Sequence, residues 1–171
     1  GFVPRLAFQD MFVQVPENGL GSGEGPTRVR DATPDDVEAI VALEYELSRI
    51  RREKDYRYFI ENREGIWHVS VYENDEGRID GFLASVRDPG SNMLGPGAAR
   101  DEGVACELIT AELDRFRGGC PVFLVPVQCA ALVARMYSLG ARNCEMHFAQ
   151  VRGAFEGFDG VIMPTFMPET A

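Results

Sequence analysis

Lysine, histidine and long apolar runs are all scarce in this sequence of 171 residues. It has one lysine against sixteen arginines, only two histidines, and no stretch near the roughly 20 apolar residues that cross a bilayer. The first five residues carry neither the charged nor the apolar region of a secretory signal peptide. We therefore expect a cytoplasmic protein without a membrane partner.

The cysteine and charge patterns exclude further classes. The four cysteines form no CxxC pair and, with two histidines, match no zinc-ligand spacing, which predicts free thiols and no metal. Asp and Glu number 27 against 17 Lys and Arg, a formal net charge of −10. Duplex nucleic acid selects for a positive surface, so we expect no nucleic-acid partner. A small anionic ligand needs only a local positive site and is not excluded.

What the sequence has is the composition of a soluble globular domain, with 45% hydrophobic residues. Residues 1–15 end in a β-forming run, and four glycines at alternate positions make 16–26 a flexible linker. A new unit is therefore expected over 27–171. The first fifteen residues either belong to another domain or pack back as an added strand.

The pattern after the linker predicts an α/β (α+β) fold with helices on both faces of a mixed sheet. Thr33 followed by Pro34 and two acids is typical of a helix start. The segment from Gly95 to Gly103 is expected to open a later helix that ends before Gly118. Strands are expected at 28–30, 67–72, 79–86, 93–94, 122–125, 144–151 and 161–166, and the other helices at 33–50, 55–62 and 128–139.

The sequence predicts a candidate anion site at the start of the third predicted helix. Small residues lead into Arg100, and Gly103 lies in the first helical turn, where another molecule can approach the backbone closely. The N–H groups of such a turn and the helix dipole favour a phosphate group. Asp101 and Glu102 are either the neighbours of this site or simply stabilise the helix start.

From Thr27 onward the chain resembles the GCN5-related N-acetyltransferase (GNAT) family. The family's acyl-CoA signature, Arg or Gln, two residues, Gly, a branched residue, then Gly or Ala, is matched by Arg100, Asp101, Glu102, Gly103, Val104 and Ala105. The resemblance implies a mostly antiparallel sheet whose middle strands splay apart, with acetyl-CoA as co-substrate. Its pyrophosphate would lie on the backbone N–H groups of 101–105, and its pantetheine would run between Met93–Leu94 and 122–125.

The same resemblance implies a function and an alternative. The first is transfer of an acetyl group from acetyl-CoA to a primary amine of a small molecule or peptide. The net negative charge of the chain would suit a cationic acceptor. The alternative is a catalytically degenerate GNAT-fold domain with a regulatory or dimerisation role, which pairs with a second copy or with a tandem GNAT domain. Residues 1–15 resemble the tail of such a preceding domain.

Two departures from the family pattern weaken the transfer of its activity to this chain and are what a degenerate domain would show. The residue after the signature arginine is usually glycine, and here Asp101 places a charge against the phosphates. The tyrosine that protonates the leaving thiolate normally lies four residues before a glycine, whereas Tyr137 lies three before Gly140 and Met136 takes the expected position. One residue is about 100° of helix rotation, so Tyr137 is either the catalytic acid or a boundary residue.

Glu145 and His147 are the remaining candidates for chemistry. They are two residues apart, so on a strand they share one face and together could act as a general base toward an ammonium group. The other interpretation is a solvated strand face. The C-terminal segment from Met163 to Thr170 is too apolar for a free tail, and its two prolines restrict it to an edge strand or an extended strap.

Overall fold

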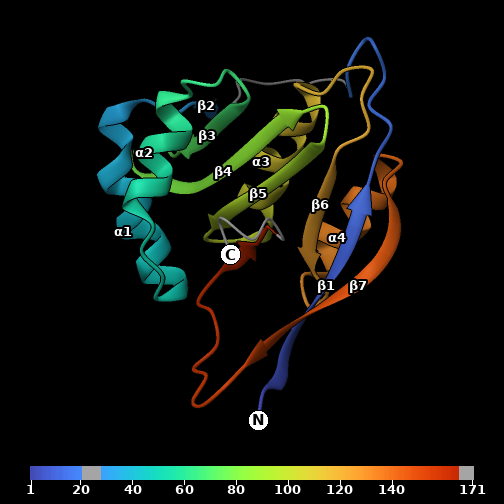
Figure 1. The fold of residues 1–171 in the computed structure, drawn as a ribbon. Helices are drawn as coiled ribbons and strands as arrows, with labels where there is room; N and C mark the ends of the chain where they lie inside the picture. The colour runs from blue at the N-terminus through green and yellow to red at the C-terminus, as the bar shows by residue number, and fades with distance from the viewer. Residues whose placement is uncertain (21–27, 166–171) are drawn as a thin grey trace.

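A computed structural model describes residues 1–20 and 28–165, which form one sheet with helices on both of its faces (Figure 1). The strands follow the order β2-β3-β4-β5-β6-β1-β7, and β8 pairs with β5 off this path. β5 and β6 are parallel, whereas the other pairs are antiparallel. The described strands are β1 Val3–Phe12, β2 Val29–Asp31, β3 Trp67–Glu73, β4 Ile79–Asp88, β5 Ser91–Ala99, β6 Val122–Pro126, β7 Arg142–Val151 and β8 Val161–Met163.

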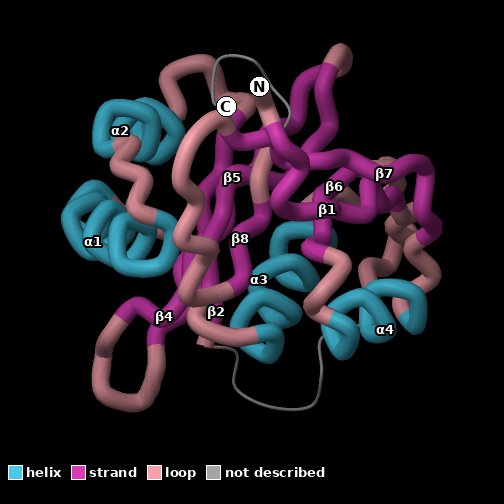
Figure 2. The backbone as a smooth tube through the Cα atoms, turned by 90° about the horizontal axis from the view of Figure 1, so that it is seen from below, coloured by secondary structure: helices cyan, strands magenta, loops and turns pink. Residues whose placement is uncertain are grey.

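The helices divide between the two faces, as Figure 2 shows. Helices α1 (Val37–Ser48) and α2 (Glu53–Glu61) lie on one face, and their buried Ile40 and Phe59 belong to one core cluster. Helices α3 (Glu102–Asp114) and α4 (Ala130–Ser138) lie on the other, and their buried Leu108 and Met136 belong to a second cluster. The predicted mixed sheet covered on both faces is confirmed. None of the described helices is long and apolar enough to cross a membrane.

Local signals explain several element boundaries. The predicted start at Thr33 is confirmed, with Pro34–Asp36 forming a single 3-10 turn that leads into α1. The Asp36 carboxylate accepts hydrogen bonds from the backbone N–H and hydroxyl of Thr33, at 2.7 and 2.9 Å, which fixes the chain at this point. Helix α2 ends at Asn62, whose φ of 43° lies in the left-handed region that stops helices. The predicted free thiols are also confirmed, because all four cysteines are unpaired.

The expectation that Gly95 to Gly103 opens a helix is wrong, because β5 continues to Ala99 and α3 begins at Glu102. The register between β4 and β5 shifts between Leu83 and Ser85, and Gly95 takes a φ of +117° at this irregularity. A Cβ on Gly97 would lie 2.8 Å from the carbonyl oxygen of Phe82. The glycines that suggested a turn instead allow a bulged strand to pack closely against β4.

Residues 3–12 are part of the same sheet as the rest of the chain. β1 lies between β6 and β7 and is antiparallel to both, and its Phe8 and Met11 are buried. The first fifteen residues thus pack back as an added strand, one of the two arrangements expected. That they resemble the tail of a preceding domain stays a prediction, and most of the predicted linker at 16–26 lies outside the described residues.

Candidate functional site

The N-terminus of α3, where the signature motif predicts a phosphate site, is capped by its own Asp101. The carboxylate Oδ1 of Asp101 accepts hydrogen bonds from the backbone N–H groups of Gly103 and Val104, at 2.8 and 2.9 Å. A side-chain oxygen at the N-cap satisfies the donors that a helix start otherwise leaves free. Two of the N–H groups predicted to hold the pyrophosphate are therefore already bonded to a negative charge.

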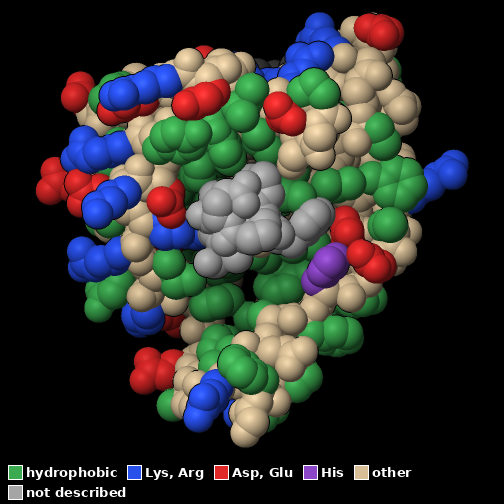
Figure 3. All heavy atoms as spheres, viewed as in Figure 1, with side chains coloured by type: hydrophobic (Ala, Val, Ile, Leu, Met, Phe, Trp, Pro, Cys, Tyr) green, Lys and Arg blue, Asp and Glu red, His purple; other side chains and the backbone are tan. Residues whose placement is uncertain are grey.

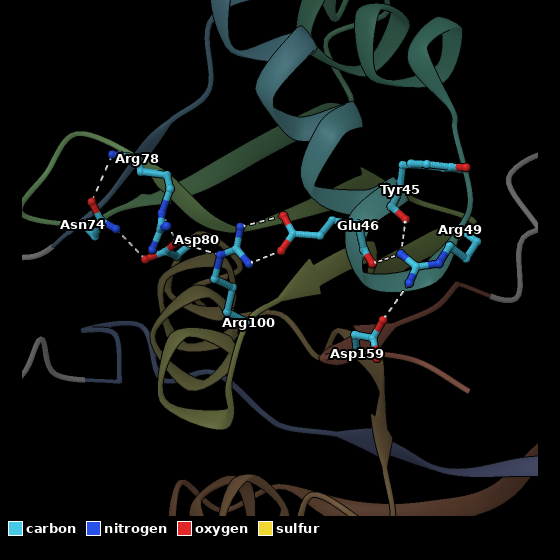
Figure 4. Close-up of polar contacts among 8 residues, drawn as sticks. All are labelled: Tyr45, Glu46, Arg49, Asn74, Arg78, Asp80, Arg100 and Asp159. Carbon is cyan, nitrogen blue, oxygen red and sulfur yellow. Dashed lines mark hydrogen bonds and ion pairs between the residues drawn. The ribbon is translucent and has the colours of Figure 1, made fainter. Parts of the chain in front are cut away.

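The Arg100 side chain is also engaged within the chain (Figure 4). Its two terminal nitrogens donate to both carboxylate oxygens of Glu46 on α1, at 2.6 and 2.8 Å. Its Nε donates to Asp80 on β4 at 2.9 Å. The Arg100 guanidinium holds the pKa of the Glu46 carboxyl below its usual range. Two carboxylates thus compensate the positive charge that was predicted to face a phosphate.

The predicted pantetheine path, between Met93–Leu94 and 122–125, is closed at one end because Met93 pairs directly with Val122, and β8 takes the edge of β5 beyond that pair. β5 and β6 pair only at Met93 and Val122 and then separate. In the separation, β8 pairs antiparallel with β5, placing Met163 opposite Gly97 and Val161 opposite Ala99. The three side chains of β8 are 2–7% exposed, so they are integrated into the core rather than laid over it.

Contacts on both sides of β8 fix it in place. Before it, the backbone N–H of Asp159 donates to the carbonyl of Leu47 at 2.9 Å, and the Asp159 carboxylate pairs with Arg49 at 3.0 Å (Figure 4). After it, the Thr165 hydroxyl contacts the sulfur of Met93 at 2.9 Å. The predicted strand at 161–166 is thus confirmed for 161–163. Residues 166–171, which hold the rest of the predicted strap, lie outside the described part.

Tyr137 lies on α4 over β1, and its hydroxyl donates to the Gln9 side chain at 2.8 Å. It is 46% exposed, whereas Met136, at the position expected for the family tyrosine, is fully buried. His147 instead contacts Asp10, the next residue of β1. Because successive residues of a strand point to opposite faces, the structure places Tyr137 and His147 on opposite sides of the sheet.

Glu145 and His147 do lie together on β7, and β1 adds a third group that the sequence reading missed. Nε2 of His147 lies 3.4 Å from Oε1 of Glu145 and 3.2 Å from Oδ2 of Asp10. Asp10 is 6% exposed and stands opposite Glu145 in the register of β1 and β7. A charged residue within the apolar run 6–13 was the available signal.

A second buried carboxylate, Glu112 on α3, was also missed. It is fully buried and accepts hydrogen bonds from the hydroxyls of Ser70 and Ser85, at 2.5 and 2.6 Å, and contacts Nδ1 of His68 at 2.7 Å. These partners come from β3 and β4. The signal in the sequence was an acid on the apolar face of a predicted helix, next to Leu113. The cluster joins α3 to the sheet.

Comparisons with known proteins find similar folds among solved structures only. No protein-family model matches the sequence, and no curated protein matches it either. Solved structures do match. A GNAT-family protein from Novosphingobium aromaticivorans DSM 12444 is 18% identical with a TM-score of 0.60, over 85% of this chain and 63% of that one. A GCN5-related N-acetyltransferase from Sphaerobacter thermophilus is 16% identical with a TM-score of 0.59, over 91% and 55%.

N-myristoyltransferase from Saccharomyces cerevisiae, solved with bound myristoyl-CoA, is 10% identical with a TM-score of 0.55, over 84% of this chain and 47% of that one. The chain thus spans between 47% and 63% of the length of these three structures. At these identities the likeness concerns the fold. The chain has the fold of the GCN5-related N-acetyltransferases.

Proposed function

We propose that this chain is a catalytically degenerate GNAT-fold domain with a regulatory or dimerisation role, the non-catalytic half of an acetyltransferase. The observation that carries the proposal is the pairing of β8 with Gly97 and Ala99 of β5. By the resemblance, pantetheine would run in the gap between β5 and β6. The gap holds a strand of the chain itself, so the residues present do not fit an acyl-CoA in that place.

The energy of displacing β8 supports the proposal. Fully burying a valine, isoleucine or methionine side chain contributes about 1.5–3 kcal/mol, so unseating the three residues of β8 would cost at least about 4 kcal/mol. A factor of ten in affinity corresponds to about 1.4 kcal/mol, so an acyl-CoA that displaced β8 would bind about a thousandfold more weakly than in an open gap.

The charges near the helix start support the same conclusion. Asp101 places a carboxylate on the N–H groups of Gly103 and Val104, where it opposes a diphosphate both by repulsion and by occupying the donors. Arg100 would have to leave Glu46 and Asp80 before it could bind a phosphate. A partner domain that carries out the transfer would then supply the acyl-CoA site.

The second candidate is an acyl-CoA-dependent N-acyltransferase that uses acetyl-CoA and a small-molecule or peptide amine. Its support is the similarity of the fold to acetyltransferases and to a myristoyltransferase solved with myristoyl-CoA. In this reading β8 would leave the gap when the co-substrate binds. The two candidates therefore differ in one measurable property, the response of β8 to acetyl-CoA.

The test combines calorimetric titration of acetyl-CoA with hydrogen exchange of residues 161–163. We expect no saturable heat up to millimolar acetyl-CoA and no change in the protection of β8. Saturable binding below that concentration, together with faster exchange in β8, would establish the acyltransferase reading instead.

Two glycine variants show whether the exchange measurement reports the pairing of β8 with β5. A Cβ on Gly160 would lie 2.6 Å from the carbonyl oxygen of Ala99, so Gly160→Ala should speed exchange at 161–163. Gly157→Ala is the matched control, because nothing lies within 4 Å of its Cβ and its cost is confined to the backbone at a φ of +88°. We expect it to leave the exchange of β8 unchanged.

A further inference from the structure

Asp10, Glu145 and His147 form a cluster of three metal-binding side chains on two neighbouring strands. One ligand atom from each lies within 4.8 Å of the other two. The Nε2 atom of His147 is 3.2 Å from Asp10 Oδ2 and 3.4 Å from Glu145 Oε1. Figure 3 shows acidic side chains and a histidine together over β1 and β7.

Asp10 supplies a second, independent observation at this cluster. Its side chain is 8% exposed, and its Oδ1 has no hydrogen-bond partner within the described part of the chain. A buried carboxylate oxygen without a partner costs free energy, because it has lost its water and gained nothing in exchange. A cation bound beside Oδ1 and Oδ2 would remove this cost.

The spacing of the three ligands fits a metal of the first transition row. Bonds of about 2.1 Å to nitrogen and oxygen place neighbouring ligands about 3.0 Å apart in an octahedron and about 3.4 Å apart in a tetrahedron. The two distances from His147, 3.2 and 3.4 Å, lie in this range. Glu145 is two-thirds exposed, so its carboxylate is free to move toward the other two ligands and complete the coordination.

We propose that Asp10, Glu145 and His147 bind one divalent cation, Zn²⁺ or Mn²⁺. One imidazole and two carboxylates suit both ions, whereas Mg²⁺ and Ca²⁺ prefer oxygen donors alone. Three protein ligands leave coordination positions open to water or to an anionic ligand. The inference does not rest on the proposed function, because the site uses neither β8 nor the start of α3.

The backbone accounts for how the three side chains meet. Asp10 pairs with Glu145, but the next pair is Met11 with Asn143, so Cys144 is an extra residue on β7 at this point. Such a bulge changes the direction of the adjacent side chains. Cys144 is exposed and adjacent to a ligand, so its thiol must be controlled for when a metal is tested.

The test measures metal binding by the full chain after dialysis against a chelator. Mn²⁺ is titrated and followed by electron paramagnetic resonance, and Zn²⁺ is titrated by calorimetry. We expect one equivalent to bind, and affinity to fall at least tenfold in His147→Asn and in Glu145→Gln. Both positions are partly or largely exposed, so these variants should fold even if Asp10→Asn does not.

Two control variants should bind as tightly as the unmodified chain. Glu53→Gln removes an exposed carboxylate on α2 whose ion pair, among the residues that the structure describes, is with Arg57. Cys144→Ser removes the neighbouring thiol while leaving the three ligands in place. The proposal is overturned if neither ion binds saturably, if His147→Asn and Glu145→Gln bind like the unmodified chain, or if Cys144→Ser abolishes binding.

Discussion

The Asp101 carboxylate occupies the backbone N–H groups that a phosphate would otherwise bind, and it also stabilises the start of α3. Replacing Asp101 therefore allows its contribution to stability and its effect on anion binding to be measured separately. In Asp101→Ala the backbone N–H groups of Gly103 and Val104 lose their acceptor, and α3 loses a negative charge at its positive end. Loss of an Asp N-cap costs typically about 1 kcal/mol and the helix-dipole contribution adds about 0.5 kcal/mol. For a chain of this size, a loss of about 1.5 kcal/mol lowers the Tm by about 3–6 °C.

The same substitution should create an anion site that the unmodified chain lacks. With Asp101 removed, the freed N–H groups of Gly103 and Val104 can bind inorganic pyrophosphate. A ligand at ten times its Kd stabilises the folded state by about 1.4 kcal/mol, which would recover most of the lost Tm. We therefore expect pyrophosphate to raise the Tm of Asp101→Ala and to leave the Tm of the unmodified chain unchanged.

Thermal unfolding with and without pyrophosphate measures both effects, and Asp101→Asn is the matched control. Asparagine keeps a capping oxygen without the charge, so it should retain most of the stability and gain little response to pyrophosphate. Equal pyrophosphate shifts in the unmodified chain and in Asp101→Ala would refute the view that Asp101 occupies the phosphate donors. An Asp101→Ala variant as stable as the unmodified chain would show that the two hydrogen bonds do not form in solution.

Two further predictions concern buried carboxylates. Glu112→Ala leaves the hydroxyls of Ser70 and Ser85 without their acceptor, at about 1–3 kcal/mol each. Urea unfolding should therefore show a loss of at least about 2 kcal/mol, whereas Glu107→Ala, at an exposed position of the same helix, should change little. The hydrogen bonds from Arg30 lower the pKa of Asp36 to about 2 from 3.8, so this carboxylate stabilises the fold above about pH 4 and loses that contribution as the pH falls toward 2. Asp36→Asn should therefore cost about 2 kcal/mol at pH 7 and only a small part of that at pH 2, where half of the carboxylates are protonated, and equal costs at both pH values would contradict the assignment.

Much of the fold could be predicted because its boundaries are set by local chemistry. Thr33 and Pro34 start a helix through capping and a fixed φ, and Gly77, with a φ of +76°, turns the hairpin between β3 and β4. Gly95 and Gly97 led to the wrong prediction of a helix start, because glycine occurs at bulges and at close backbone contacts as well as at turns. The local sequence does not distinguish these uses.

The candidate site was less predictable because it depends on contacts between distant parts of the chain. Asp10 reaches His147 only because β1 inserts between β6 and β7, and the periodicity of residues 6–15 does not indicate which strands it joins. β8 could be predicted as an extended segment, but not that it enters the gap beside Gly97. The capping of α3 by Asp101 was easier to predict from the sequence, because aspartate is among the strongest N-caps and stands directly before the helix.

The capping by Asp101, the ion pairs of Arg100 and the pairing of β8 with β5 have one physical reason in common. A GNAT fold without acyl-CoA would leave free N–H groups at the start of α3, an uncompensated Arg100, and unpaired strand edges between β5 and β6, and each of these costs free energy. In this chain Asp101 satisfies the N–H groups, Glu46 and Asp80 compensate the arginine, and β8 pairs the edge of β5. A domain that exchanged acyl-CoA at every turnover would have to break all three arrangements each time. A domain that keeps the fold for another purpose gains stability from every one of them, and this is the physical basis of the proposed non-catalytic role.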